Sequence, residues 1–196
     1  MTPEIRAFEF ALGLFSVLIG LSIADVATSL HRLIRKNEVV RWDPLTLLAT
    51  LFALLMIIGM WFDLWGIRNA TSVRSFFFYI ALVAAFFVLF LIAASSLPDE
   101  ATGAVDLRSY YDANRRYFWL LVTLFQVIYV GFGFHFIAGI IAHEPLRLLA
   151  VVLVQWGLLI IVPAMLTLVR SRPVHYAGLI VLFAVDLWHY APYSIN

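Results

Sequence analysis

Long apolar stretches separated by short polar breaks dominate this sequence. A helix that crosses a membrane needs about 20 consecutive apolar residues, and six such stretches follow one another along the chain. They cover approximately residues 10–33, 45–66, 76–97, 118–142, 146–169 and 174–191. Because backbone groups in lipid must be paired within the protein, the pattern predicts an all-α polytopic membrane bundle of six transmembrane helices. Residues 1–196 then form a single transmembrane domain.

The composition favours a lipid environment over water. Hydrophobic residues make up 64% of the chain and charged residues 13%, whereas soluble domains carry about 45–50% and about 25%. The chain has no cysteine, which excludes disulfides and cysteine-ligated metals. The net charge of +1 gives no indication of the strongly basic surface that nucleic-acid binding requires. No catalytic, cofactor or metal motif occurs, so no catalytic residue, cofactor or metal is predicted.

The positions of arginine and lysine predict the orientation of the chain. The loops after the first, third and fifth stretches hold most of the basic residues, and such loops usually face the cytoplasm. Both termini are therefore predicted on the outer side. The expected inner interface includes Arg32, Arg115, Arg116, Trp42 and Trp119, and the expected outer one includes Trp61, Trp65 and Trp188.

Residues 98–117 form the longest polar segment, and they are predicted to be a solvated inner loop. An alternative is a flexible start followed by a short interfacial helix from Asp106 that leads into the fourth span.

A weak internal similarity raises the question of duplication. "DPLTLLA" at residues 43–49 and "EPLRLLA" at residues 144–150 agree at five of seven positions, and both open an apolar stretch. Two halves of three spans each would form a 3+3 inverted repeat, as in many transporters. Chance similarity between leucine-rich spans is the alternative.

The first apolar stretch carries an aspartate in its inner part. Placing a carboxylate in mid-span costs about 2.5–3.5 kcal/mol, so Asp25 should face protein or water. Ser22 and Ser29 lie on the same helical face as Asp25. The sequence indicates either a proton or cation site at Asp25, or a hydrogen-bonded carboxyl group that locks two helices together.

Further polar residues occur in the later spans. His135 is either a packing histidine or a proton carrier or metal ligand. Asp186 and His189 share the most polar helical face of any span with Tyr190 and Tyr193, on the outer side, where Glu9 and Asp63 are also expected. Together with His135 these residues could form an outer vestibule or a metal site of aspartate and histidine ligands, although aspartate and histidine at this spacing often form only a hydrogen bond.

Some segments have sequences that membrane spanning alone does not require. They are "GLSIADVATSLHRLIR", "RWDPLTLL" and "LPDEATGAVDLRSYYDANRRYF". In these segments the chain resembles a family of small six-span bacterial membrane proteins without an established activity. The resemblance implies a location in the bacterial cytoplasmic (inner) membrane, and it carries no functional residues over to this chain.

Two kinds of function fit these observations. The first is a channel or transporter that passes an ion or small solute, with proton linkage, in which Asp25 serves the inner half of the path and His135 and Asp186 serve the outer half. The alternative is a non-transporting accessory or scaffold subunit of a larger membrane complex. An enzyme or haem protein that uses His135 and His189 is disfavoured by the lack of catalytic motifs. The expected partners are the lipid bilayer and a second copy of the chain, a homodimer first, or a larger membrane complex.

Overall fold

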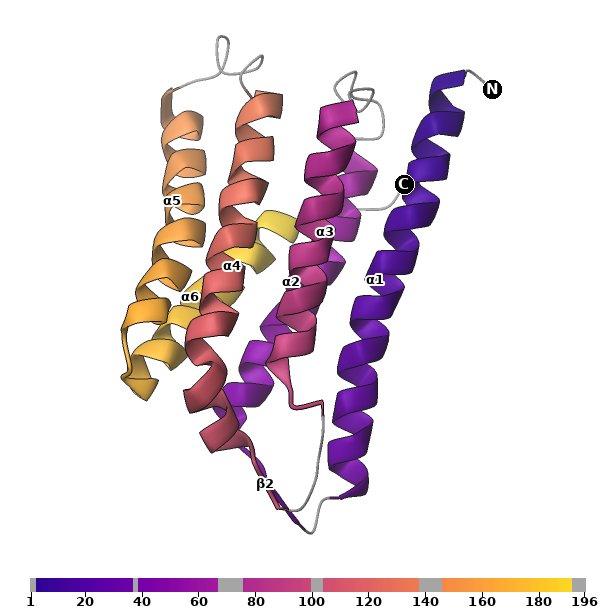
Figure 1. The fold of residues 1–196 in the computed structure, drawn as a ribbon. Helices are drawn as coiled ribbons and strands as arrows, with labels where there is room; N and C mark the ends of the chain where they lie inside the picture. Colours follow the sequence, from indigo (N-terminus) through magenta and orange to yellow (C-terminus); the bar gives the residue numbers. More distant parts are fainter. Residues whose placement is uncertain (1–2, 37–38, 67–75, 100–103, 138–145, 192–196) are drawn as a thin grey trace.

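The computed structural model describes residues 3–36, 39–66, 76–99, 104–137 and 146–191 (Figure 1). In chain order the elements are α1 (Pro3–Arg35), β1 (Val40–Arg41), α2 (Pro44–Gly66), α3 (Phe76–Ser96), β2 (Val105–Asp106), α4 (Leu107–Ile137), α5 (Leu146–Leu168) and α6 (Arg172–Tyr190). The predicted all-α architecture is confirmed. Each of the six apolar stretches overlaps one of these helices.

Five of the described helices are long and apolar enough to cross a membrane. They are α1 to α5. Helix α6 has 19 residues and is not among the described helices that meet both conditions. The fold therefore supports a membrane-embedded helical protein with five candidate spans.

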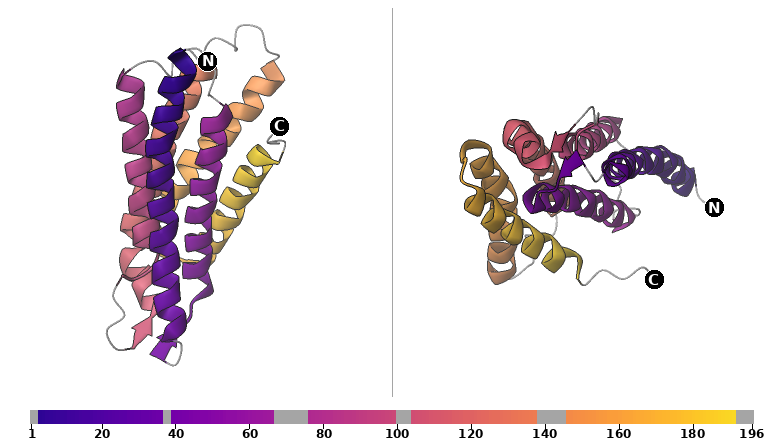
Figure 2. Two further views of the ribbon diagram at one scale, coloured as in Figure 1. Left: turned by 90° about the vertical axis from the view of Figure 1, so that its right-hand side faces the viewer. Right: turned by 90° about the horizontal axis from the view of Figure 1, so that it is seen from below.

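The helices form two rows (Figure 2). One row runs α5, α4, α3 and α1, and the second row consists of α6 and α2, which cross the face of the first. Helix α2 packs against α1, α3, α4 and α6, and it is the most buried of the five candidate spans. The interior of the bundle therefore lies around α2, with α4 and α6 as its neighbours.

Helix α2 begins where the sequence supplies a strong N-terminal signal. Asp43 precedes Pro44, whose fixed φ angle suits the first helical position. The Asp43 carboxylate accepts a hydrogen bond from the backbone N–H of Thr46 at 3.1 Å, which is the usual contact of an N-cap residue. This cap places a buried carboxylate at the end of the bundle.

Helix α4 begins eleven residues earlier than its predicted apolar span. Residues 107–117 are helical and continue without a break into the apolar part, so this part of residues 98–117 is helix rather than loop. The Asp106 carboxylate caps the helix by accepting hydrogen bonds from the backbone N–H groups of Arg108 and Ser109 at 2.9 and 3.2 Å. The alternative of a helix that starts near Asp106 and leads into the fourth span therefore describes the structure better.

Strands β1 and β2 join two loops at one end of the bundle, which we call the strand end. They pair in parallel, with Val40 opposite Val105 and Arg41 opposite Asp106, and the last two also form an ion pair at 3.8 Å. The connections after α1, α3 and α5 all lie at this end (Figure 1). The three loops that are rich in basic residues, and that the sequence predicts on one side of the membrane, therefore lie at the same end of the fold.

The packing of the two halves gives the predicted 3+3 repeat no support. Within the described residues, α1 packs mainly against α3, whereas α4, its counterpart in the second half, packs mainly against α5 and α3. Helices related by a repeat should have equivalent neighbours. The similarity between residues 43–49 and 144–150 is therefore not matched by equivalent packing.

Trp119 corrects one prediction from the sequence. It was expected at the membrane interface, but its side chain is 0% exposed and packs near Phe52 and His175. Trp188, by contrast, is 76% exposed, as expected of an interfacial anchor. Hydropathy cannot separate these two cases because it does not say which face of a helix meets lipid.

Candidate functional site

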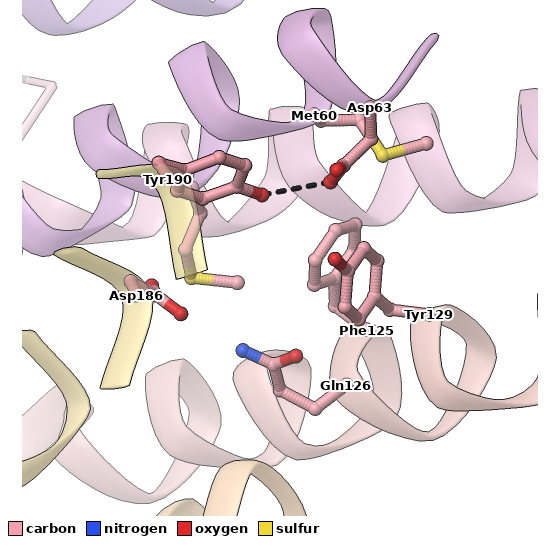
Figure 3. Close-up of a pocket in the computed structure, with 8 residues that line it drawn as sticks. Met60, Asp63, Phe125, Gln126, Tyr129, Asp186 and Tyr190 are labelled. Carbon is pink, nitrogen blue, oxygen red and sulfur yellow. Dashed lines mark hydrogen bonds between the residues drawn. The ribbon is translucent and has the colours of Figure 1, made fainter. Parts of the chain in front are cut away.

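Helices α2, α4 and α6 enclose a small cavity in the half of the bundle away from the strand end. Figure 3 shows the polar side chains that converge on it. Its volume is about 20 Å³, which is room for one water molecule. It is lined by Met56, Met60, Asp63, Phe125, Gln126, Tyr129, Asp186 and Tyr190. The predicted outer residues Asp63 and Asp186 therefore share one site.

Hydrogen-bonding groups form a cluster around Asp63. The Tyr190 hydroxyl donates to Asp63 Oδ2 at 2.7 Å, and His189 Nε2 lies 3.6 Å from Asp63 Oδ1. The Tyr129 hydroxyl lies 3.3 Å from the same His189 nitrogen. This cluster connects the cavity to His189, whose side chain is partly exposed.

Gly59 allows Tyr190 to reach this position. A Cβ atom at residue 59 would lie only 2.5 Å from the Tyr190 ring, closer than real Cβ contacts allow. The ring can therefore lie across α2, one helical turn before Asp63, only because residue 59 has no side chain. The sequence places Tyr190 on the polar face of the last span, but it does not identify Gly59 or this contact, since the contact joins residues far apart in the chain.

Asp186 is the most isolated acidic group of the site. It is 7% exposed, and among the described residues no side chain or backbone group donates a hydrogen bond to its carboxylate. Its carboxylate points into the space toward Gln126 (Figure 3). The nearby ionisable groups that act on it are His189 and Asp63. A buried carboxylate in a cavity with no donor among the described residues is a candidate functional group.

A second polar cluster occupies the strand end. The Arg172 guanidinium, at the start of α6, pairs with Asp43 and with Asp112 on α4 at 3.0 Å. It also lies over the Tyr111 ring, 5.9 Å from the ring centroid. Arg172 therefore joins the beginnings of α2, α4 and α6, which come from three distant parts of the chain.

Hydrogen bonds beside Arg172 define the tautomer of His175. Its Nε2 atom lies 3.0 Å from the Val169 carbonyl oxygen, which can only accept, so Nε2 carries the proton. Its Nδ1 atom then accepts from the Tyr111 hydroxyl at 2.7 Å, and that hydroxyl accepts from Trp119 Nε1 at 2.9 Å. The sequence analysis did not single out Tyr111 or His175, because both resemble ordinary interfacial residues until α4 and α6 are placed side by side.

The capping residue Asp43 provides a testable pH dependence. Burial raises its pKa, but hydrogen bonds from Arg172 and Thr46 outweigh burial and hold the pKa of Asp43 below its ordinary value. Such a group stabilises the fold above its ordinary pKa of about 3.9, and this contribution is lost as the pH falls through the folded-state pKa. We expect the thermal midpoint in detergent, followed by circular dichroism, to fall on acidification below about pH 4.

The control for this pH effect is Asp43→Asn, which has no carboxyl group to titrate. This variant should start from a lower midpoint at neutral pH and lose less on acidification. An equal loss in the wild-type protein and in Asp43→Asn would show that other groups cause the acid sensitivity.

An apolar layer separates the two polar clusters. Phe52 on α2, Val122 on α4 and Leu182 on α6 are all 0% exposed. On α4, Val122 stands between Trp119 of the strand-end cluster and Gln126 of the cavity, which are about 10 Å apart along the helix axis. The interface of α2, α4 and α6 is therefore polar near both ends and closed by packed side chains between them.

Asp25 does not line the cavity. It is half-buried on α1, and the charged groups that act on it are Asp99 and Arg32. Its predicted neighbours Ser22 and Ser29 are buried. The Ser22 hydroxyl donates to the Leu18 carbonyl at 2.8 Å, and Arg32 donates to the Ser29 hydroxyl at 3.2 Å. Asp25 and Asp186 therefore belong to different regions of the bundle.

The remaining predicted residues have varied positions. Arg115 donates to the Val169 carbonyl at the strand end, and Arg116 and Arg32 are exposed near the same end. The side chains of Glu9 and His135 lie outside the part of the chain that the structure describes. Within that part, no group of three or more acidic or histidine side chains converges as metal ligands would.

Comparisons with known proteins do not extend these observations. No protein-family model, no curated protein and no solved structure matches the chain significantly. The class of protein therefore follows from its apolar helices, and the candidate site follows from its geometry.

Proposed function

We propose that this chain is an integral membrane protein that passes an ion along the interface of α2, α4 and α6. Asp186 carries the proposal, because it is buried, its carboxylate has no hydrogen-bond donor among the described residues, and it faces a cavity of water size. Burying a carboxylate in a membrane is costly. A protein that keeps one is therefore expected to use it, here to bind the passing ion. The small cavity favours an ion over a larger solute.

In this structure the middle of the proposed path is blocked by buried apolar side chains. Its outer half is the cavity with Asp186, and the polar strand end supplies its inner half, where Tyr111 and His175 lie on one side and Asp25 on the other. The layer of Phe52, Val122 and Leu182 would have to part during passage. Transport proteins commonly alternate between such closed and open arrangements.

We further propose that α6 is the sixth span. Its 19 residues correspond to about 28 Å of helix, close to the hydrocarbon thickness of about 30 Å. Ile180, Leu187 and Trp188 are exposed on it, as lipid-facing side chains would be. The proposed location is the bacterial inner membrane, with the strand end in the cytoplasm and both termini outside.

Reconstitution into liposomes tests this function. Under an imposed voltage or pH gradient, vesicles with the wild-type protein should pass an ion, and Asp186→Asn should slow passage by about 100-fold. Asp106→Asn, the same exchange at the half-buried cap of α4, is the matched control and should pass ions like the wild type, since asparagine also caps helices. Inert wild-type liposomes under every gradient would contradict the proposal.

A non-transporting accessory subunit is the second candidate. The apolar layer favours it, since a bundle closed by fully buried side chains is also what a structural subunit requires. In that case Asp186→Asn and Asp25→Asn should change stability or retention of a partner, with no flux in any variant. Purification in mild detergent distinguishes the two, because an accessory subunit should copurify with a larger complex. Light scattering on the same sample tests the proposed homodimer.

A further inference from the structure

We propose that Asp186 is a proton-binding group and that the ion taken by this site is the proton. This inference rests on the proposed function for its role in passage, but proton binding at Asp186 can be measured without any flux. Asp186 is more than nine-tenths buried, and its carboxylate has no donor among the described residues and points into a cavity with room for one water molecule.

The surroundings of the cavity suit a proton better than a metal cation. Its polar lining consists of two carboxylates, two tyrosine hydroxyls and one amide, and the rest is methionine and phenylalanine. A dehydrated cation needs several oxygen ligands converging at close range, and among the described residues no three acidic or histidine side chains converge in this way. A proton needs only one carboxylate oxygen and one water.

The transfer step follows from the groups present. The O–H bond of the protonated Asp186 breaks as its proton moves to the cavity water, which passes one of its own protons to the Asp63 carboxylate. The Asp186 carboxylate keeps the electron pair, and the water is regenerated. His189 Nε2 is 3.6 Å from Asp63 Oδ1 and partly exposed, so it can exchange the proton with the outside.

The ionisable groups around Asp186 come from each helix packed on the site. Helix α2 contributes Asp63, α4 contributes Tyr129, and α6 itself contributes His189 and Tyr190. Helix α5, which also packs on α6, has Arg147 as its one ionisable residue in the sequence, and the side chain of Arg147 lies outside the described part. Asp63 and His189 are therefore the groups expected to shift the titration of Asp186.

Infrared spectroscopy of the full chain in lipid nanodiscs tests proton binding directly. Difference spectra between acidic and alkaline pH should show a carboxylic-acid C=O band that Asp186→Asn removes. Asp25→Asn is the matched control, and it should retain this band because Asp25 lies outside the cavity. His189→Gln should shift the pH at which the band titrates without removing it. The same band in the wild type and in Asp186→Asn would overturn the inference.

Flux measurements separate this inference from the proposed function. If Asp186→Asn lowers the proton flux in liposomes by about 100-fold, the result supports both ion passage and the proton as the ion that is passed. Flux of sodium or potassium without protons overturns the proton as cargo but leaves ion passage intact. A titrating Asp186 band in a protein that passes no ion supports proton binding and overturns the proposed function.

Discussion

Replacing Arg172 with methionine is expected to lower the free energy of unfolding by about 3–5 kcal/mol, because it leaves a buried carboxylate without its partner. The Asp43 side chain is 8% exposed and faces the Arg172 guanidinium. Methionine keeps much of the length of the arginine side chain but none of its hydrogen bonds. Unfolding in mixed micelles with increasing dodecyl sulfate, followed by circular dichroism, measures the loss.

The matched control is Arg170→Met, two residues away. Arg170 is exposed, and exposed charges contribute about 0–1 kcal/mol. The double variant Asp43→Asn with Arg172→Met should recover part of the loss, since it removes the unpaired charge as well. Equal stability of Arg172→Met and Arg170→Met would show that Arg172 does not hold the strand end together.

Replacing Trp119 with alanine is expected to cost about 3–5 kcal/mol, the usual range for removing a fully buried tryptophan. The side chain is 0% exposed and fills the space between α4, α2 and α6 beside Phe52 and His175. Its loss also removes the N–H donor to the Tyr111 hydroxyl. Because lipid does not drive helices together as water does, this packing is a main source of helix association.

Trp188→Ala is the matched control for this second prediction. It removes the same side chain from a position that is 76% exposed, where surface substitutions usually change stability by less than about 0.5 kcal/mol. The same micelle titration compares the two variants. A larger loss for Trp188 than for Trp119 would place Trp119 at the membrane interface after all, as its sequence position first suggested.

The helices were predictable because lipid imposes simple rules on them. The apolar stretch at residues 45–66 matches α2 (Pro44–Gly66), and the stretch at residues 146–169 matches α5 (Leu146–Leu168). The prediction failed at residues 107–117, where a polar amphipathic sequence continues as helix below the apolar span. Hydropathy detects contact with lipid, and this part of α4 packs against protein at the strand end instead.

The candidate site was only partly predictable. Asp63, Asp186 and His189 were expected together on the outer side, since polar residues in apolar spans are few and therefore conspicuous. Tyr190 was expected on the same polar face, but its bond to Asp63 and the role of Gly59 were not identified, because both depend on how closely α6 approaches α2. Asp25 was expected to serve the inner half of the path, and that role stays a prediction.

The sequence by itself determined that this chain is a bundle of apolar helices, which helices there are, and that the connections rich in basic residues belong to one end. These properties follow from the local cost of placing polar backbone and charge in lipid. Only the tertiary structure decided which polar residues meet. Arg172 pairs with Asp43, which is 129 residues away in the sequence, and Tyr190 donates to Asp63, which is 127 residues away. These contacts form because helix packing, and no local sequence pattern, brings α6 against α2.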